Sequence, residues 1–221
     1  KELLVLMQRN VQASGQQDGC LIRVYNLDAG NLDAGDLDAG NLEDRRDSPV
    51  FEFHRDEEND CTGPRLTDAA EIVPGALLFE PGKALMKAGC FRLIGQRFGA
   101  SALGRDTHYY ILRENTPDTA TSTSSATNIS SATGRKHFGG RRCLKDSGKL
   151  FRILHIAEMS GKELKEFGKR HPEAEVTARN VRITSEELRR RLGCKPSDRY
   201  HIFALHTDTP GKNLLLFTKR I

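Results

Sequence analysis

The stretch Thr184-Ser-Glu-Glu-Leu-Arg-Arg-Arg-Leu-Gly193 decides the fold of the last third of this chain. A threonine followed three residues later by a glutamate forms a capping box, which begins a helix, and a glycine suits the helix end. Leu188 and Leu192 are four residues apart, so they share one face of this helix. The same signature occurs in Ser160-Gly-Lys-Glu163, and it begins a second helix that Pro172 ends.

Short apolar or alternating segments surround these two helices and predict strands. The predicted strands cover residues 149–156, 175–181, 200–205 and 214–218, with Pro210-Gly211 in the turn between the last two. The tail is therefore expected to run from a leading strand through the order α-β-α-β-β.

The first 112 residues carry a less regular pattern. We expect strands over residues 2–7, 20–25, 50–54, 76–79 and 107–112, an acidic turn over 56–60, and one helix from Glu80-Pro81 to Gly99. Phe51 and Phe53 are two residues apart in a strand and should share one face. The helix has apolar residues around most of its circumference, which predicts that it is buried.

Two tracts of biased composition interrupt this pattern. Asn26-Leu-Asp-Ala-Gly30 is repeated at 31–35 and 36–40, with a decayed copy at 41–44. A β-solenoid needs more stacked copies, and the aspartate spacing does not match an EF-hand loop, so the repeat is interpreted as a lengthened hairpin loop. Residues 115–134 are rich in Ser, Thr and Ala without periodicity, which predicts a disordered insertion between strands.

The two parts of the chain carry opposite charge. Residues 135–221 hold 21 Lys+Arg and 10 Asp+Glu, a balance of +11, whereas residues 1–134 have a balance of −7, so that the whole chain reaches +4. A basic tail with a globular pattern suggests a polyanionic partner, most simply nucleic acid.

Cellular context follows from a few absences in the sequence. No run of 18 apolar residues predicts a membrane span, and no signal peptide is recognisable. The five cysteines are widely spaced without a Cys-x-x-Cys pair, which predicts unpaired thiols in a reducing cytoplasm. The chain lacks an initiator Met and begins inside an apolar run, so we expect it to be a fragment whose N-terminal neighbour is missing.

No catalytic constellation or metal site is recognisable. The chain has no Gly-rich turn between a strand and a helix, no phosphate loop and no nucleophile elbow. The seven histidines lack the spacing of metal ligands, and His201 and His206, which flank a strand, are interpreted as surface or half-buried residues.

The run Arg189-Arg190-Arg191 fans over the exposed arc of its helix, and further cations lie near it in sequence. These residues could form a surface for a polyanion, or a solvated helix face that Glu186 and Glu187 partly neutralise. No aromatic-interleaved segment is present, so base stacking with single-stranded RNA is not indicated.

Two segments resemble a known family. Gly75-Ala-Leu-Leu-Phe-Glu-Pro-Gly-Lys-Ala-Leu-Met-Lys-Ala-Gly89 resembles the signature of a ferredoxin-like domain that follows the catalytic domain in bacterial class I S-adenosylmethionine-dependent methyltransferases. Val176-Thr-Ala-Arg-Asn180, followed by Ser185-Glu-Glu-Leu-Arg-Arg-Arg-Leu192, resembles the THUMP-like domain that closes the same proteins. Val181-Arg182 replaces the usual Phe-Pro of that signature, and the catalytic nucleotide-binding domain is absent.

The resemblance implies an α+β architecture. A ferredoxin-like domain would cover residues 1–158, with inserted loops at about 26–48 and 115–147, and a small basic THUMP-like α/β domain would cover 159–221. Glu80, Pro81, Lys87 and Gly89 belong to the first signature without an assigned role. The resemblance also implies that S-adenosylmethionine is the cofactor of the parent enzyme and that this chain itself has no cofactor site.

The resulting expectation is a substrate-recognition module of a cytoplasmic methyltransferase, with structured RNA and the missing catalytic domain as partners and with no membrane or metal involved. The alternative is a non-catalytic scaffold that packs on the catalytic domain or dimerises it. The candidate RNA-binding residues are Arg179, Asn180, Arg182, Arg189, Arg190, Arg191 and Lys195.

Overall fold

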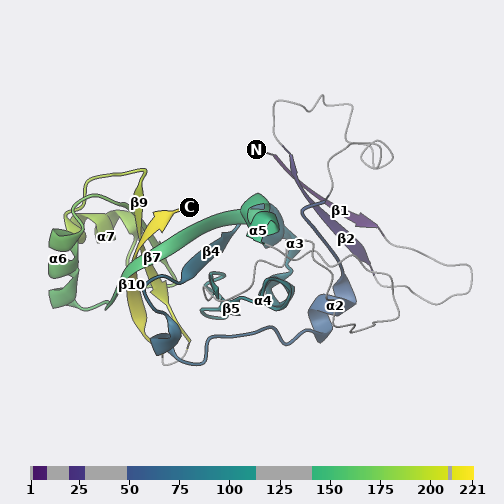
Figure 1. The fold of residues 1–221 in the computed structure, drawn as a ribbon, viewed down its shortest axis with the longest axis horizontal. Helices are drawn as coiled ribbons and strands as arrows, with labels where there is room; N and C mark the ends of the chain where they lie inside the picture. The colour runs from purple at the N-terminus through teal and green to yellow at the C-terminus, as the bar shows by residue number, and fades with distance from the viewer. Residues whose placement is uncertain (1, 9–19, 28–48, 113–140, 209–210) are drawn as a thin grey trace, which may run out of the picture. The chain divides into compact units, whose positions relative to one another are not determined.

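The computed structural model describes residues 2–8, 20–27, 49–112, 141–208 and 211–221 (Figure 1). The chain forms two compact units, and each unit is assembled from three separate segments. Residues 1–62, 81–98 and 117–148 make unit 1, and residues 63–80, 99–116 and 149–221 make unit 2. The two biased tracts lie almost entirely outside the described residues, so their interpretation as loops stays a prediction, as does the predicted domain boundary between residues 158 and 159.

Unit 1 combines a small antiparallel sheet with short helices. Its elements are β1 (Glu2–Gln8), β2 (Leu21–Leu27), β3 (Phe51–His54), α2 (Arg55–Asp60), α3 (Lys83–Ala88), α4 (Phe91–Phe98) and α5 (Arg141–Ser147). The sheet order is β1-β2-β3. Phe51 and Phe53 are both buried, as their spacing predicts, and the Phe51 ring centroid lies 5.7 Å from that of Phe98.

The single helix predicted from Glu80-Pro81 to Gly99 is wrong. Pro81 ends strand β4, and the helical region is broken in two at Gly89, whose φ of +67° suits the end of α3. Both short helices bury apolar residues, and this shared burial produced a continuous apolar pattern in the sequence. The predicted acidic turn over residues 56–60 is also wrong, because these residues lie in α2.

Contacts from helix α2 explain why α3 can end at Gly89 and α4 can begin directly after it. The buried carboxylate of Glu58 accepts hydrogen bonds from the backbone N–H groups of Arg92 and Leu93, each at 3.0 Å, in the first turn of α4. Arg55 donates to the carbonyl of Ala88 at 3.0 Å, at the end of α3. One carboxylate and one guanidinium from α2 thus satisfy the free ends of the two helices.

Unit 2 is built on a seven-stranded sheet with the order β5-β6-β4-β7-β10-β9-β8. Strands β8 and β9 are parallel, whereas β10 runs antiparallel to both of its neighbours, β7 and β9. The elements are the 3-10 turn η2 (Ala69–Glu71), β4 (Leu77–Pro81), β5 (Ser101–Ala102), β6 (Tyr110–Leu112), β7 (Gly148–Glu158), α6 (Gly161–Arg170), β8 (Glu175–Arg179), α7 (Ser185–Leu192), β9 (Tyr200–His206) and β10 (Asn213–Arg220). The helices and strands predicted for the tail are confirmed.

Helices α6 and α7 begin as the capping signatures predict. The Ser160 hydroxyl accepts from the N–H of Glu163, and the Thr184 hydroxyl accepts from the N–H of Glu187, both at 3.2 Å. The apolar sides of the two helices form one buried cluster with Val176, Ile202 and other sheet residues. We call this side of the sheet the helix-covered face.

The opposite side of the same strands has a different character. Phe151, Ile153, Phe203 and Leu205 are buried there with residues of the loop that precedes β4, such as Leu66. Because side chains alternate along a strand, His201 and Lys149 continue this face beyond the apolar cluster. We call this side the open face. The mixture of helices and sheets confirms the predicted α+β class.

Candidate nucleic-acid interface

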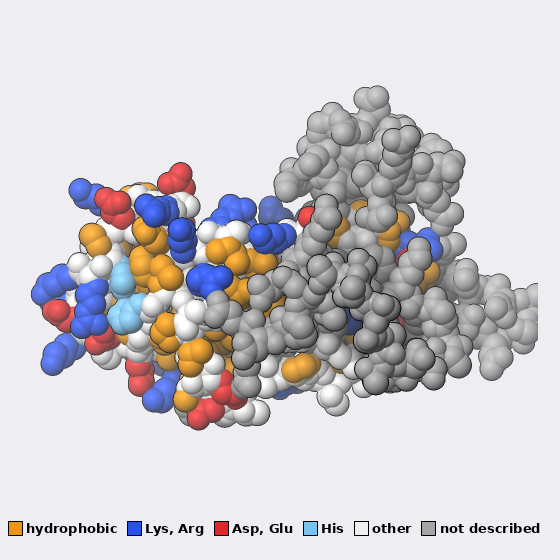
Figure 2. Space-filling view, in the orientation of Figure 1, with side chains coloured by type: hydrophobic (Ala, Val, Ile, Leu, Met, Phe, Trp, Pro, Cys, Tyr) orange, Lys and Arg blue, Asp and Glu red, His pale blue; other side chains and the backbone are white. Residues whose placement is uncertain are grey.

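The arginine run on α7 is partly neutralised by neighbouring carboxylates. Arg189 Nη2 lies 2.9 Å from Glu175 Oε1, and Arg191 Nη2 lies 2.5 Å from Glu187 Oε1. Figure 2 shows Lys, Arg, Asp and Glu side chains interspersed around α6 and α7. Within the described part of the chain, the structure records no ion pair or side-chain hydrogen bond for the exposed Arg190. The run therefore offers one unengaged cation rather than three.

The remaining RNA-binding candidates are of two kinds. Asn180 has a structural role, and the others are cations exposed to solvent. Asn180 has a φ of +54°, a left-handed conformation that asparagine tolerates better than most residues, and its Nδ2 donates to Thr107 Oγ1 at 3.5 Å. The motif asparagine thus has a role in the turn. Arg179, Arg182 and Lys195 are exposed.

Glu80, a motif residue without an assigned role, organises a polar cluster on the open face. Its carboxylate accepts from Tyr109 Oη at 2.9 Å and from Lys149 Nζ at 3.2 Å. Burial and the neighbouring Glu80 raise the pKa of Tyr109 well above its ordinary value, and Arg179 partly opposes this shift. Tyr109 therefore stays protonated, and Glu80 holds the ammonium group of Lys149 at the end of β7.

The other motif residues in this segment belong to the chain turn already described. Pro81 is buried at the end of β4, Lys87 is exposed in the last turn of α3, and Gly89 supplies the left-handed end of that helix. Pro81 and Gly89 therefore have structural roles in unit 1, and Lys87 keeps no assigned role.

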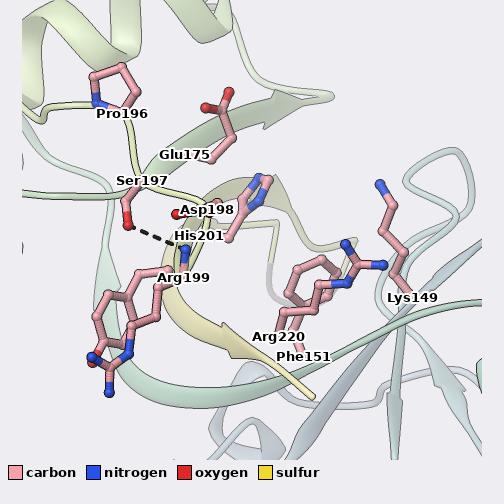
Figure 3. A pocket seen from close by; sticks show the side chains of 10 residues that line it. Lys149, Phe151, Glu175, Pro196, Ser197, Asp198, Arg199, His201 and Arg220 are labelled. Atoms are coloured by element: carbon pink, nitrogen blue, oxygen red, sulfur yellow. Dashed lines mark hydrogen bonds between the residues drawn. The ribbon is translucent and has the colours of Figure 1, made fainter.

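Next to the Glu80 cluster the open face contains a hollow of about 550 Å³. Strands β7, β8, β9 and β10 and the loop before β9 supply its walls (Figure 3). The lining residues are Lys149, Phe151, Glu175, Pro196, Ser197, Asp198, Arg199, Tyr200, His201 and Arg220. We call this hollow the sheet-end pocket.

Charges in the sheet-end pocket are separated. In Figure 3, Lys149 and Arg220 lie on one side of His201, and Glu175 and Asp198 lie on the other. Arg199 points away from this group, and its guanidinium carbon lies 5.2 Å from the ring centroid of Tyr200. The backbone N–H of Arg199 donates to Ser197 Oγ at 3.3 Å, which shapes the loop that carries Asp198.

His201 forms the floor of this pocket as an uncharged ring. Its Nε2 lies 2.7 Å from Thr177 Oγ1, and its ring stacks on Phe203 with the centroids 4.0 Å apart. Burial lowers the pKa of His201 to about 4, and Lys149 adds to this shift while Glu80 and Glu175 oppose it. At neutral pH the pocket therefore has a flat neutral floor between two cations and two carboxylates.

Sequence reasoning did not select the residues that meet in this pocket. Lys149 and Arg220 were outside the candidate set, and His201 was interpreted only as a surface or half-buried residue; the structure makes it half-buried. The signal that could have found them is the alternation of Lys149 with Phe151 and of His201 with Phe203 on adjacent strands.

Comparisons with known proteins agree with the domain content of this fold. The family model of a ferredoxin-like domain matches residues 77–118, and that of a THUMP domain-like family matches residues 148–220. The chain carries a THUMP-like domain. That domain begins with β7, so it contains the whole of the sheet-end pocket.

One solved structure gives a match over most of this chain. It is a protein of Porphyromonas gingivalis W83 that is provisionally described as a methyltransferase, with 23% sequence identity and a TM-score of 0.54. The alignment covers 77% of this chain and 34% of that protein, so the present chain spans about a third of its length. Comparison with functionally curated proteins gives no significant match.

Three further observations concern the described residues. Within them, no three or more His, Cys, Asp or Glu side chains are grouped in a way that could hold a metal ion. No helix in the described ranges is both long and apolar enough to cross a membrane. Cys20, Cys61, Cys90 and Cys194 are free thiols.

Proposed function

We propose that the THUMP-like domain binds structured RNA and presents it to a methyltransferase domain that lies outside residues 1–221. In this proposal S-adenosylmethionine is the cofactor of that other domain, and the whole protein acts in the cytoplasm. Support comes from the THUMP-like match and from the provisional description of the Porphyromonas gingivalis protein.

The observation that carries the RNA-binding proposal is the position of Lys149 and Arg220 on the open face. Both cations border a single hollow, and both are exposed to solvent. Phosphate contacts supply much of the affinity of proteins for nucleic acids. Two cations that extend from adjacent strands can contact neighbouring phosphates of one RNA backbone.

The arginines of α7 take a smaller part in this proposal. At Arg189 and Arg191 an RNA phosphate would have to compete with the carboxylates of Glu175 and Glu187, as it would with that of Glu80 at Lys149, but neither arginine borders the sheet-end pocket. Arg190 is the arginine of the run that could bind a phosphate without displacing a carboxylate recorded in the described residues. The expected interface is therefore centred on the sheet-end pocket, with Arg179 as an additional cation, and Arg190 on α7 should contribute less.

The test is a binding titration of the whole 221-residue chain with a fluorescent RNA hairpin at several salt concentrations. The variant Lys149→Gln/Arg220→Gln should lose about tenfold in affinity at moderate salt. Its log–log salt slope should flatten by roughly one to two units, because each lost phosphate contact removes about 0.7–0.9 from the slope. Arg190→Gln alone should flatten the slope by less than one unit.

The matched control is Lys162→Gln/Lys165→Gln, which removes two exposed positive charges from α6. This variant should leave most of the affinity intact, since the removed charges lie on the opposite side of the sheet. Equal losses in both double variants would show a diffuse charge effect and would reject the open face as the interface.

A scaffold is the second candidate function, and the paired charges around α6 and α7 favour it. A chain that binds no RNA in a salt-dependent way would support the scaffold and overturn the proposal.

Calorimetric titration with S-adenosylmethionine is a separate test, in which the isolated chain should release no heat of binding. A saturable site for that cofactor would contradict the assignment of the chemistry to another domain.

A further inference from the structure

The sheet-end pocket has features that a general phosphate-binding surface does not need. A surface that binds only the phosphate backbone of RNA requires cations. The sheet-end pocket also has the carboxylate of Asp198 and the neutral ring of His201. Asp198 is exposed at the pocket, and the structure records no hydrogen bond or ion pair for it within the described residues. The second carboxylate, Glu175, is engaged by Arg189.

The register of the strands sets the spacing of these groups. Thr218 on β10 lies opposite His201, and Lys219 lies opposite Tyr200, so Arg220 extends to the level at which the loop with Asp198 joins β9. Arg220 also lies opposite Phe151 on β7. Since adjacent strands lie about 4.8 Å apart, the groups from β7 to β9 are spread over about 10 Å.

The floor of the pocket suits a flat ring. Phe203 covers one face of the His201 ring, and the half-buried ring lines the pocket, which leaves part of it accessible. A neutral imidazole can stack with a nucleobase without adding a charge, and stacking on such a platform favours all bases. Stacking alone would therefore give no preference between bases.

We propose that the sheet-end pocket holds one unpaired nucleotide of the RNA and selects a base that carries an exocyclic amino group. The phosphate contacts Lys149 and Arg220, the base lies over His201, and the amino group donates to the carboxylate of Asp198. This inference rests on the proposed RNA-binding function and narrows it to the kind of nucleotide that the domain selects.

Carboxylate chemistry gives the selectivity. An ionised aspartate only accepts hydrogen bonds, so it favours the bases with an exocyclic amino group, which are cytosine, adenine and guanine. Uracil presents carbonyl oxygens at the corresponding positions and would place acceptor against acceptor. The hollow of about 550 Å³ has the size of a small-molecule site and is too confined for a double helix, so the selected nucleotide has to be unpaired.

The test uses the whole chain with fluorescent oligoribonucleotides of about ten residues, a typical site size for single strands. Oligo(C) and oligo(A) should bind about five- to tenfold more tightly than oligo(U), and more tightly than a blunt duplex of the same length. Asp198→Asn should reduce this preference to less than twofold, because the amide presents a donor as well as an acceptor. Glu173→Gln, an equal loss of charge outside the pocket, should leave the preference unchanged.

Lys149→Gln separates the phosphate contact from base selection. It should weaken oligo(C) and oligo(U) by the same factor and leave their ratio as it is. Equal binding of all oligonucleotides by the unmodified chain, or a preference that survives in Asp198→Asn, would overturn the base selection and leave RNA binding standing. Absence of binding to every oligonucleotide and to the hairpin would overturn both proposals. Circular dichroism of each variant checks that it is folded.

Discussion

The two faces of the sheet in unit 2 are covered in different ways. On the helix-covered face, α6 and α7 pack an apolar cluster against β8, β9 and β10. On the open face, the apolar cluster, which includes Tyr109, stops short of the strand ends, and Glu80, Lys149 and His201 follow it. The contrast shows that the number of basic residues in a segment does not locate an interface. What matters is which cations border a common hollow, as Lys149 and Arg220 do.

The largest effect should come from the closest approach on the helix-covered face. A Cβ atom added at Gly168 in α6 would lie 1.8 Å from the carbonyl oxygen of Leu192 at the end of α7. Since that oxygen belongs to the backbone, Gly168→Ala should move one helix and destabilise the protein by about 3 kcal/mol or more. Urea unfolding followed by circular dichroism measures the loss.

Gly161 in the first turn of the same helix is the matched control. No atom lies within 4 Å of a Cβ added there, so Gly161→Ala should be neutral or stabilising by up to about 1 kcal/mol. Equal destabilisation by the two substitutions would contradict the view that the helix-covered face is limited by backbone contact.

A medium effect should appear in acid, and it involves a histidine from each face. Burial lowers the pKa of His201 on the open face to about 4, and burial together with the neighbouring His155 lowers that of His171, which follows α6, to about 4. The unfolded chain binds these protons near pH 6.5, before the folded protein does. Stability should therefore be complete above pH 6.5 and fall as the pH drops towards 4.

Because both rings are partly exposed, the expected loss is about 1–2 kcal/mol for each histidine. Thermal unfolding at pH 7 and pH 4.5 measures it. His201→Gln cannot bind the proton and should reduce the pH dependence by the contribution of one group. A pH profile identical to that of the unmodified chain would show that His201 is hydrated in the folded state.

The smallest effect should be at Asn180, which separates a structural role from RNA contact. Asn180→Gly keeps access to the left-handed conformation and should change stability by less than Asn180→Ala, which we expect to cost about 1 kcal/mol. Neither variant should alter RNA affinity by more than twofold in the salt titration. A large loss of affinity with unchanged stability would return Asn180 to the RNA-binding set.

Local signals in the sequence predicted the tail well, and the interface poorly. The capping residues Ser160 and Thr184 act within four residues, so their helices could be predicted without knowledge of the tertiary structure. The partners of Glu80 are Tyr109 and Lys149, which are 29 and 69 residues away. No pattern within a short window of sequence connects such residues, and this is why the Glu80 cluster beside the sheet-end pocket could not be predicted.

The break at Gly89 shows a second limit of local patterns. Apolar residues around a helix indicate burial, but they do not show whether one helix or two produce it. Glu58 and Arg55 favour two helices, because they bind the free N–H groups of α4 and a free carbonyl of α3. Both lie 33 to 35 residues before the groups that they bind. The sequence contained both residues, and only the folded contacts reveal their roles.

The order of the strands also constrains when unit 2 can fold during synthesis. Strand β10, residues Asn213–Arg220, lies between β7 and β9 in the middle of the sheet. During synthesis the sheet therefore cannot close until residues 213–220 have left the ribosome. A chain that ends before β10 would expose unpaired edges on β7 and β9, so such a truncated product would be a substrate for quality-control proteases.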